Sequence, residues 1–304
     1  MEETAVDHGL VGPVRSAVTI GSEGRTVILF DQRGRVTATA RRETGQGGQA
    51  RGEHSKRFEY DEAGRLRRII TSATTFGSPG GSRSPAPSQE TTFEYKDGHL
   101  VRQTDAAFGR RFNVVTWRYD DLGRVTEHRS RSEIGDRTPE VTRYRYDAPP
   151  PDFPVAVEPS WSAARVEQAG QIEGATLWLL SDTSGMKRVE AVQKGNRWTV
   201  VHLNDARGHS VHEFSFVLGV TGQQVGCYLG IRREYDPRGN PATEQAGCYE
   251  DYAAFVEGRG DVLGTVEFDY QLDERGNWTA LSRMLVREDV RQSGPASRRE
   301  VTYY

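Results

Sequence analysis

The sequence has few of the features that mark a membrane protein, a nucleic-acid-binding protein or a metal site. Its 304 residues contain no run near the roughly 18 apolar residues of a membrane helix, so no membrane span is expected. The 40 basic and 43 acidic side chains are interspersed and leave a formal charge of −3, which argues against nucleic acid as a partner. The sequence also lacks a Gly-rich phosphate loop, a zinc-spaced Cys/His set and a nucleophile elbow.

Hydrophobic residues are also scarce, at 35% of the chain, so they cannot fill a thick core and should lie along one face of thin elements. The opening "MEETAVDHGLVGPVRS" has no signal-peptide pattern. Two expectations therefore stay open. Either Met1 is the native start of a cytoplasmic protein, or an export segment was removed from an extracytoplasmic one, which a lipid anchor could hold at a membrane.

What the chain does contain is a recurring phrase, seen as "FEYDEAGRL" at 58–66, "WRYDDLGRV" at 117–125 and "REYDPRGNP" at 233–241. Two apolar or aromatic residues stand two positions apart, followed by Asp, a short turn with Gly, and Arg or Asn. The predicted repeat turns are Asp31 with Gly34, Asp61 with Gly64, Asp97 with Gly98, Asp120 with Gly123, Asp236 with Gly239, and Asp273 with Gly276.

Each copy has the chemistry of a β-hairpin end. Phe58 and Tyr60 project to one face of a strand, and the Asp61 carboxylate can bond backbone amides two residues on. Gly64 supplies the positive φ at which such a turn closes through a bulge. Successive copies predict an all-β fold, an array of antiparallel hairpins in a long, curved and twisted meander sheet. Unrelated hairpins in a sandwich are the alternative.

The middle of the chain is less regular. Residues 147–170 are too rich in proline for a central strand and predict an irregular junction, with one short helix near 160–170 between a Ser160 N-cap and Gly170. Residues 77–89 predict a flexible loop. We expect a single domain over 1–304, with a linker between two half-sheets at 147–170 as the alternative.

These copies resemble YD repeats, the unit of the Rhs family, of the B and C components of Tc insecticidal toxins, and of teneurin shells. The residues that carry the resemblance are Tyr60-Asp61 with Gly64-Arg65, Tyr119-Asp120 with Gly123-Arg124, and Tyr235-Asp236 with Gly239-Asn240. The resemblance implies hairpins in a curling sheet, which closes into a hollow shell in large members. Roughly eight hairpins are expected to be too few to enclose a folded domain. The self-cleaving segment and C-terminal toxin of the family are lacking, so the nearest likeness is to short, stand-alone bacterial YD-repeat proteins, which are often exported.

Cys227 and Cys248 are the only cysteines, and they flank the Asp236 turn symmetrically. On a simple hairpin they lie opposite each other, within reach of a disulfide, while a one-residue bulge would place Cys248 opposite Tyr228. A disulfide would indicate an extracytoplasmic compartment. Two buried thiols are the alternative.

No residue stands out as catalytic, cofactor-binding or metal-binding. His202, His209 and His212 are close in the sequence and could form a metal site. His209 and His212 are three residues apart, however, which places them on opposite faces of a strand, whereas metal ligands must converge. Ser184 and Lys187 have the spacing of a serine–lysine nucleophile but fall in an expected hairpin rather than a helix. A carboxylate pair of glycosidase type stays open, because Asp and Glu are plentiful.

Aromatic residues of several copies fall in register on one face of the sheet. They form either a thin core or a stripe that binds a polysaccharide or a partner protein. The candidate stripe consists of Phe58, Tyr60, Trp117, Tyr119, Tyr144 and Tyr146. The function expected first is a non-enzymatic, exported scaffold that needs no cofactor. The alternatives are a glycan hydrolase or lyase with carboxylates on the exposed face, and an accessory that adds strands to a larger Rhs-type toxin shell.

Overall fold

The computed structural model describes residues 4–5, 8, 10–44, 50–75, 84–85, 88–135, 137–157, 160–168, 175–182, 187–194, 197–218, 224–287 and 290–304. Within these ranges, 22 strands form one sheet, as the sequence predicted for an all-β protein. The strands are β1 (Val14–Gly21), β2 (Gly24–Phe30), β3 (Val36–Thr44), β4 (Ala50–Tyr60), β5 (Leu66–Thr75), β6 (Ser84–Pro85), β7 (Gln89–Lys96), β8 (His99–Ala107), β9 (Arg110–Tyr119), β10 (Val125–Ser132), β11 (Glu140–Arg145), β12 (Ser162–Gln168), β13 (Ala175–Ser181), β14 (Arg188–Lys194), β15 (Arg197–Asn204), β16 (Ser210–Leu218), β17 (Gln224–Tyr235), β18 (Pro241–Tyr249), β19 (Asp261–Leu272), β20 (Trp278–Arg287), β21 (Val290–Ser293) and β22 (Ser297–Tyr303).

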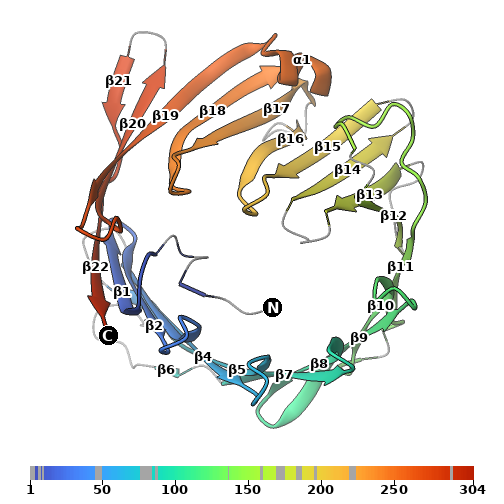
Figure 1. Cartoon of the computed structure of the whole chain (residues 1–304), viewed down its shortest axis with the longest axis vertical. Helices are drawn as coiled ribbons and strands as arrows, with labels where there is room; N and C mark the ends of the chain where they lie inside the picture. Colours follow the sequence, from blue (N-terminus) through green and yellow to red (C-terminus); the bar gives the residue numbers. More distant parts are fainter. Residues whose placement is uncertain are drawn as a thin grey trace.

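The sheet closes on itself, so the prediction of an open meander is wrong. Neighbouring strands pair antiparallel around the whole circuit, and the last strand, β22, pairs with the first, β1, in a register that sets Ala17 opposite Val301 (Figure 1). The short strands β6 and β21 lie beside this circuit, because β5 also pairs with β7 and β20 with β22. Closure follows because the twist of the sheet accumulates from strand to strand and brings its two edge strands together. The backbone groups of these two strands then hydrogen-bond to each other.

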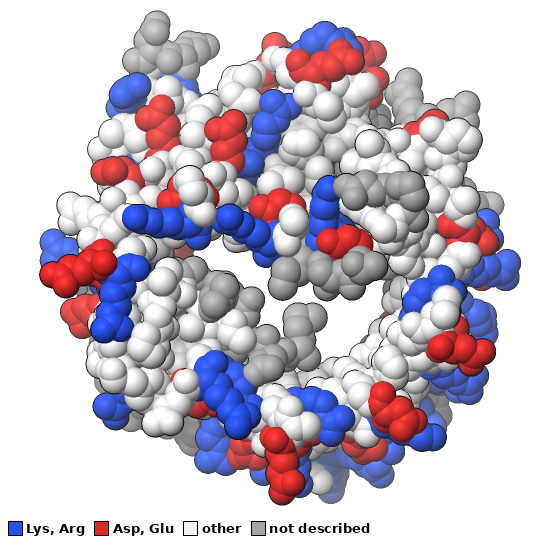
Figure 2. Space-filling view, viewed as in Figure 1, with Lys and Arg blue, Asp and Glu red and all other residues white. Residues whose placement is uncertain are grey.

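The ring has an inner and an outer face, and each strand alternates between them. Figure 2 shows an opening through the centre of the ring, with basic and acidic side chains interspersed around it. The start of the chain lies inside the ring (Figure 1). There Ala5 and Leu10 pack with inward-facing residues such as Phe30, Val36 and Phe58 in one hydrophobic cluster.

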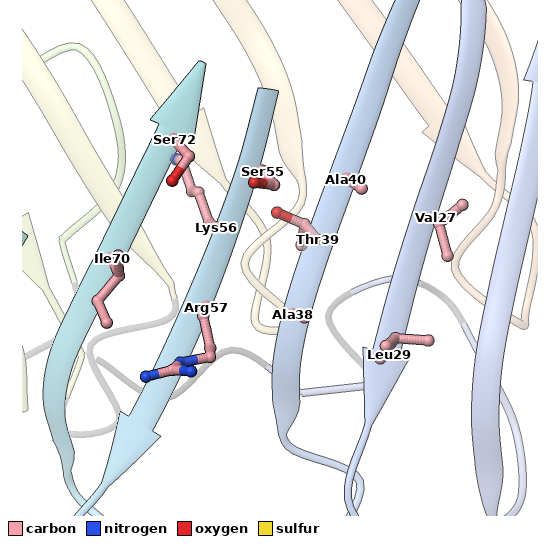
Figure 3. A pocket seen from close by; sticks show the side chains of 10 residues that line it. All are labelled: Val27, Leu29, Ala38, Thr39, Ala40, Ser55, Lys56, Arg57, Ile70 and Ser72. Carbon is pink, nitrogen blue, oxygen red and sulfur yellow. The ribbon is translucent and has the colours of Figure 1, made fainter. Parts of the chain in front are cut away.

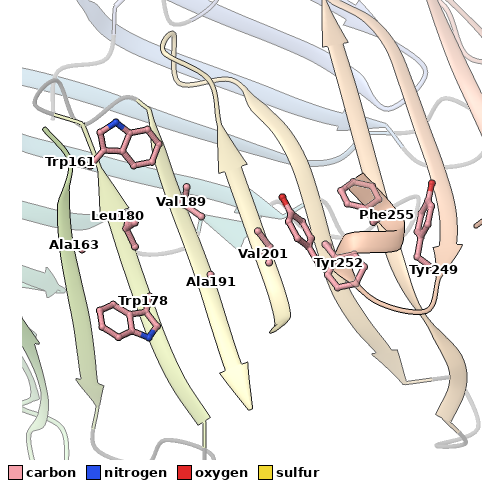
Figure 4. Packing of buried hydrophobic residues seen from close by; sticks show 11 residues of the cluster. Trp161, Ala163, Trp178, Leu180, Val189, Ala191, Val201, Tyr249, Tyr252 and Phe255 are labelled. Atoms are coloured by element: carbon pink, nitrogen blue, oxygen red, sulfur yellow. The ribbon is translucent and has the colours of Figure 1, made fainter. Parts of the chain in front are cut away.

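A second hydrophobic cluster covers the outer face of β12–β18. It contains Trp178, Val201 and Phe214 of the sheet, and the helix α1 (Tyr252–Glu257) packs Tyr252 and Phe255 against Phe214. Figure 4 shows Trp178 and Val201 on the strands of this cluster, with the helix at one end of it. The helix begins after Asp251, whose side chain accepts a hydrogen bond from the Ala254 amide, and ends at Gly258 in the left-handed region. Within the described ranges, no helix is long and apolar enough to cross a membrane.

The helix predicted near 160–170 is wrong. Residues 162–168 form β12, which pairs with β11 on one side and β13 on the other. Trp161 and Ala163 face the outer cluster, while Ala164 and Val166 are buried on the opposite face. Tertiary contacts outweigh the helix propensity of these residues. As a strand, the segment buries side chains on both faces of the sheet, and its backbone hydrogen-bonds to β11 and β13.

Within the Pro-rich junction predicted at 147–170, residues 147–157 form neither strand nor helix, whereas residues 162–168 form β12. The irregular segment crosses the outer face of the ring, and its residues Phe153, Val155 and Val157 pack on the outer cluster (Figure 1). It therefore belongs to the core of the closed sheet. Most of the loop predicted at 77–89 lies outside the described residues, apart from β6 and the start of β7.

Candidate functional site

Three of the repeat turns, those of Asp31, Asp61 and Asp120, share one hydrogen-bond arrangement. In the turn between β2 and β3, Asp31 Oδ1 accepts bonds from the backbone amides of Arg33 (2.8 Å) and Arg35 (3.0 Å). Its Oδ2 accepts a bond from Arg35 Nε at 2.8 Å. The same contacts join Asp61 to Arg65 and Asp120 to Arg124. The Asp thus holds its own turn closed and fixes the Arg that follows it.

Each fixed Arg then reaches the next copy of the repeat. The Arg35 guanidinium stacks over the ring of Tyr60 at 4.5 Å, and the Tyr60 hydroxyl donates to the Val36 carbonyl oxygen at 2.7 Å. Two further pairs follow the same scheme along the rim, Arg65 over Tyr95 and Arg124 over Tyr146. In the last copy the position after Gly276 is Asn277, and Arg275 from within the turn stacks over Tyr303 instead. We call this series of Asp, Arg and Tyr contacts the turn ladder. The sequence pattern predicted the hairpin ends, but not that each Tyr contacts the turn of another copy.

Copies without Arg keep part of the ladder. His209 takes the place of the Arg: it stacks on Tyr235 at 4.5 Å, and its Nδ1 lies 3.2 Å from Asp205 Oδ2. The turn at Asp97 and Gly98 differs, because both residues have positive φ, of 51° and 84°, in a two-residue turn between β7 and β8. The ladder is therefore tolerant of variation in single copies.

The last copy ties the start of the chain to the ring. Asn277 is fully buried, and its side-chain amide bonds the backbone of Val11 in both directions, accepting from the amide and donating to the carbonyl oxygen at 3.0 Å. Arg299 lies 3.7 Å over Trp278 on the inner face and donates to the His8 carbonyl oxygen. Burial lowers the pKa of Arg299 to about 10. The first and last segments are thus joined by side chains as well as by strand pairing.

The ladder lowers the pKa of its carboxylates. Burial acts to raise the pKa of Asp31, but hydrogen bonds from Arg35 and Arg33 outweigh it and hold this pKa below its ordinary value of 3.8. The same balance lowers the pKa of Asp61, and in Asp120 the side-chain bond from Arg124 is the largest influence. The pKa is also lowered in Asp205, Asp236 and Asp273.

We therefore predict that acid weakens the fold. A carboxylate with a lowered folded-state pKa stabilises the protein above its unfolded pKa, and this contribution is lost as the pH falls through the folded value. Thermal unfolding followed by circular dichroism should show Tm falling steeply between about pH 5 and about pH 2. Asp31→Asn should cost about 1 kcal/mol near neutral pH and almost nothing in acid, whereas the exposed control Glu62→Gln should cost little at either pH. An equal cost of Asp31→Asn at both values would contradict the role of its charge.

The predicted aromatic stripe does not form one open surface. Phe58 is buried in the inner cluster, and the hydroxyls of Tyr60, Tyr119 and Tyr146 donate to backbone carbonyls of neighbouring copies. Trp117 lies against the imidazole of His128, with ring centroids 5.5 Å apart. The part of the stripe that lines a hollow is Tyr144, in an inner-face pocket of about 240 Å³ that also includes His128, Glu140 and Glu190. Binding by this stripe stays a prediction.

The histidines considered as a metal set lie apart. His209 belongs to the turn ladder, His212 faces outward with its Nδ1 3.2 Å from the Tyr252 hydroxyl, and His202 pairs with Glu190 and Glu213 across neighbouring strands. Among the residues that the structure describes, no group of three His, Cys, Asp or Glu has metal-binding geometry. Ser184 lies outside the described residues.

Cys227 and Cys248 form a disulfide between β17 and the end of β18. Both registers predicted for this hairpin are wrong, because Cys248 pairs with Leu229 rather than with Cys227 or Tyr228. The turn sets Tyr235 opposite Pro241, one residue away from the symmetric register, and the bulge between Glu234 and Tyr235 adds a second residue to the shift. The bridge therefore runs diagonally, and it ties β17 to the end of β18, the strand that leads to α1.

A groove of about 420 Å³ opens on the outer face, and Tyr228 and Glu250, close to Cys227 and Cys248 in the sequence, are among its lining residues. Three aromatic residues and four carboxylates line it, together with small apolar residues. The lining residues are Asp152, Pro154, Trp198, Tyr228, Glu250, Asp251, Tyr252, Ala253, Val256 and Glu257. We call this the outer groove. Sequence reasoning missed it because its walls come from the Pro-rich junction, β15, β17 and α1; the cluster "YEDYAAF" at 249–255 was the available signal.

The walls of the outer groove are held by specific contacts. The Trp198 indole N–H donates to the Asp152 carbonyl oxygen at 2.9 Å, and its ring meets Phe153 edge to face. Tyr228 stacks on Phe214 at 5.0 Å. Tyr252 is almost fully buried, and burial raises its pKa to about 12. Its hydroxyl therefore stays protonated at any physiological pH.

A shallower apolar depression of about 410 Å³ lies across β2–β5, on the face opposite Phe30 and Phe58. Figure 3 shows its side chains along these four strands. They are Val27, Leu29, Ala38, Thr39, Ala40, Ser55, Lys56, Arg57, Ile70 and Ser72. It presents an open sheet surface in which polar side chains such as Thr39, Ser55 and Lys56 alternate with apolar ones.

Comparisons with known proteins match part of the chain to a repeat family. Residues 95–133 match the family model described as RHS Repeat. A search of curated proteins gives no match. Among solved structures, the chain is similar to a porin-like protein from Bacteroides uniformis, at 11% identity over 96% of this chain and 99% of the other, with a TM-score of 0.38. It is also similar to TcdB2-TccC3-TEV, at 10% identity and a TM-score of 0.26, over 90% of this chain but only 19% of that longer one.

Proposed function

Since the chain carries an RHS repeat at residues 95–133, we propose that it is a non-catalytic, ring-shaped scaffold that works outside the cytoplasm and binds a partner at the outer groove. The observation that carries the proposal is the turn ladder. The charged and aromatic residues that define the repeat bond to one another, as Asp61 does to Arg65 and Tyr95 to the Leu66 carbonyl. The defining residues of the repeat thus stabilise the ring.

The Cys227–Cys248 disulfide supports the proposed compartment. Disulfides persist in oxidising environments and are rare in the cytoplasm. Thiol trapping in acid-quenched cells tests this part of the proposal. We expect both cysteines to resist alkylation until a reductant is added, and rapid alkylation of both without reductant would contradict it.

The outer groove supports binding because it combines aromatic rings with carboxylates in a concave site. A glycan-active enzyme is the alternative that its carboxylates leave open. The shell-accessory alternative loses its docking edge, since the backbone of β22, which includes Val301, is paired with β1.

The test of the scaffold against the enzyme uses the oxidised protein and a panel of soluble neutral, acidic and amino-sugar polysaccharides. We expect no release of reducing ends from any of them. Release that disappears in Glu250→Gln but persists in Glu62→Gln, a carboxylate at the opposite rim, would overturn the non-catalytic assignment.

A further inference from the structure

We infer that the outer groove binds a positively charged, Lys- and Arg-bearing segment of a partner protein, an inference that rests on the proposed scaffold function and names its ligand. The first argument is charge. Asp152, Glu250, Asp251 and Glu257 line the groove, and no Lys or Arg is among its ten lining residues. In a concave site, the negative potentials of neighbouring carboxylates add up and attract a cation.

Two cations lie near the groove, and they offset only part of its negative charge. Arg232 donates to the Phe255 carbonyl oxygen at 2.6 Å and stacks on the Phe255 ring, beneath α1. Arg259 pairs with Glu257, the last residue of α1, and so neutralises one of the four lining carboxylates. Asp251 caps α1, while Asp152 and Glu250 are both exposed. The negative charge offered to a ligand is therefore that of Asp152 and Glu250, with Asp251 beside them.

The second argument is the aromatic lining. Trp198 and Tyr228 are half-buried and Tyr252 is buried, so they present ring surface to the groove. Ammonium and guanidinium groups are attracted to the faces of such rings, and long Lys and Arg stems pack on them. A neutral glycan would use the rings but not four carboxylates, and an anionic glycan would be repelled by them. The combination therefore favours a basic peptide.

The third argument is that the groove is built to keep its shape. The disulfide joins Cys227, next to Tyr228, to Cys248, two residues before Glu250. A Cβ on Gly230 would lie 2.4 Å from the Phe255 ring, and one on Gly260 would lie 2.3 Å from Tyr249. Glycine at these positions lets α1 dock closely against the sheet. A preformed site loses less conformational entropy on binding and so retains more affinity.

Fluorescence anisotropy with a labelled peptide of alternating arginine and lysine tests the inference, with glutamine and glutamate versions of the same length for comparison. The groove variant combines Asp152→Asn, Glu250→Gln and Glu257→Gln, and spares Asp251 because it caps α1. The control variant combines Glu62→Gln, Asp121→Asn and Glu274→Gln, three exposed carboxylates at the repeat turns. Both variants change the net charge equally, so they separate the groove from general electrostatics. Circular dichroism checks that each variant is folded.

We expect saturable binding of the basic peptide that weakens about tenfold in the groove variant and less than about twofold in the control variant. Binding should also weaken as salt rises. Equal weakening in both variants, equal affinity for the glutamine peptide, or no saturable binding would each overturn the inference. Groove-dependent binding of a polysaccharide without binding of the basic peptide would overturn it too, while leaving the scaffold assignment standing.

Discussion

Replacing Phe255 by alanine should lower the free energy of unfolding by about 3–5 kcal/mol. The Phe255 side chain has no exposed surface, and its ring lies within 5.0–5.7 Å, centroid to centroid, of those of Phe214, Tyr249, Tyr252 and His212. Alanine would leave a cavity between α1 and the outer face of the sheet, where the neighbouring rings are too constrained to close it.

Urea denaturation followed by tryptophan fluorescence measures this loss. Phe108→Ala is the matched control, because Phe108 is 79% exposed at a hairpin end; its effect should stay within about 0.5 kcal/mol. A loss below about 1 kcal/mol for Phe255→Ala would show that the docking of α1 contributes little to the stability of the ring.

Replacing both Cys227 and Cys248 by serine should lower the free energy of unfolding by about 3 kcal/mol, because the bridge closes a loop with a sequence separation of 21 residues. The same change should loosen the outer groove, since the bridge fixes the segments that carry Tyr228 and Glu250. The measurement is urea denaturation of the wild type with and without a reductant, beside the double variant. The reductant should weaken the wild type and leave the double variant unchanged. Equal stability of all three would contradict a stabilising role for the bridge.

The repeat could be predicted from the sequence because its chemistry is local. An Asp, a Gly with positive φ and two alternating aromatic residues determine a hairpin end within nine residues, as at 58–66. The match of residues 95–133 to the RHS Repeat model confirms that assignment. The contact from Tyr60 to Val36 was beyond such reasoning, because it depends on how two hairpins lie side by side.

Closure of the ring could not be predicted for a related reason. It rests on the pairing of Ala17 with Val301, at opposite ends of the chain, and on small twists summed over the strands between them. The strand at 162–168 was mistaken for a helix because its tertiary partners, rather than its own residues, determine its conformation. The outer groove could not be predicted because its walls, the Pro-rich junction, β15, β17 and α1, are far apart in the sequence.

The closed ring is tested most directly by a cross-link between the first and last strands. Val18 and Glu300 are directly paired across β1 and β22, within the distance that a disulfide spans. With Val18→Cys and Glu300→Cys in one chain, mild oxidation followed by peptide mapping should give an intramolecular link in the monomer. A control with Val18→Cys and Ser72→Cys, on β1 and β5, should give none. Free thiols at positions 18 and 300, or links only between molecules, would contradict a ring that closes on itself.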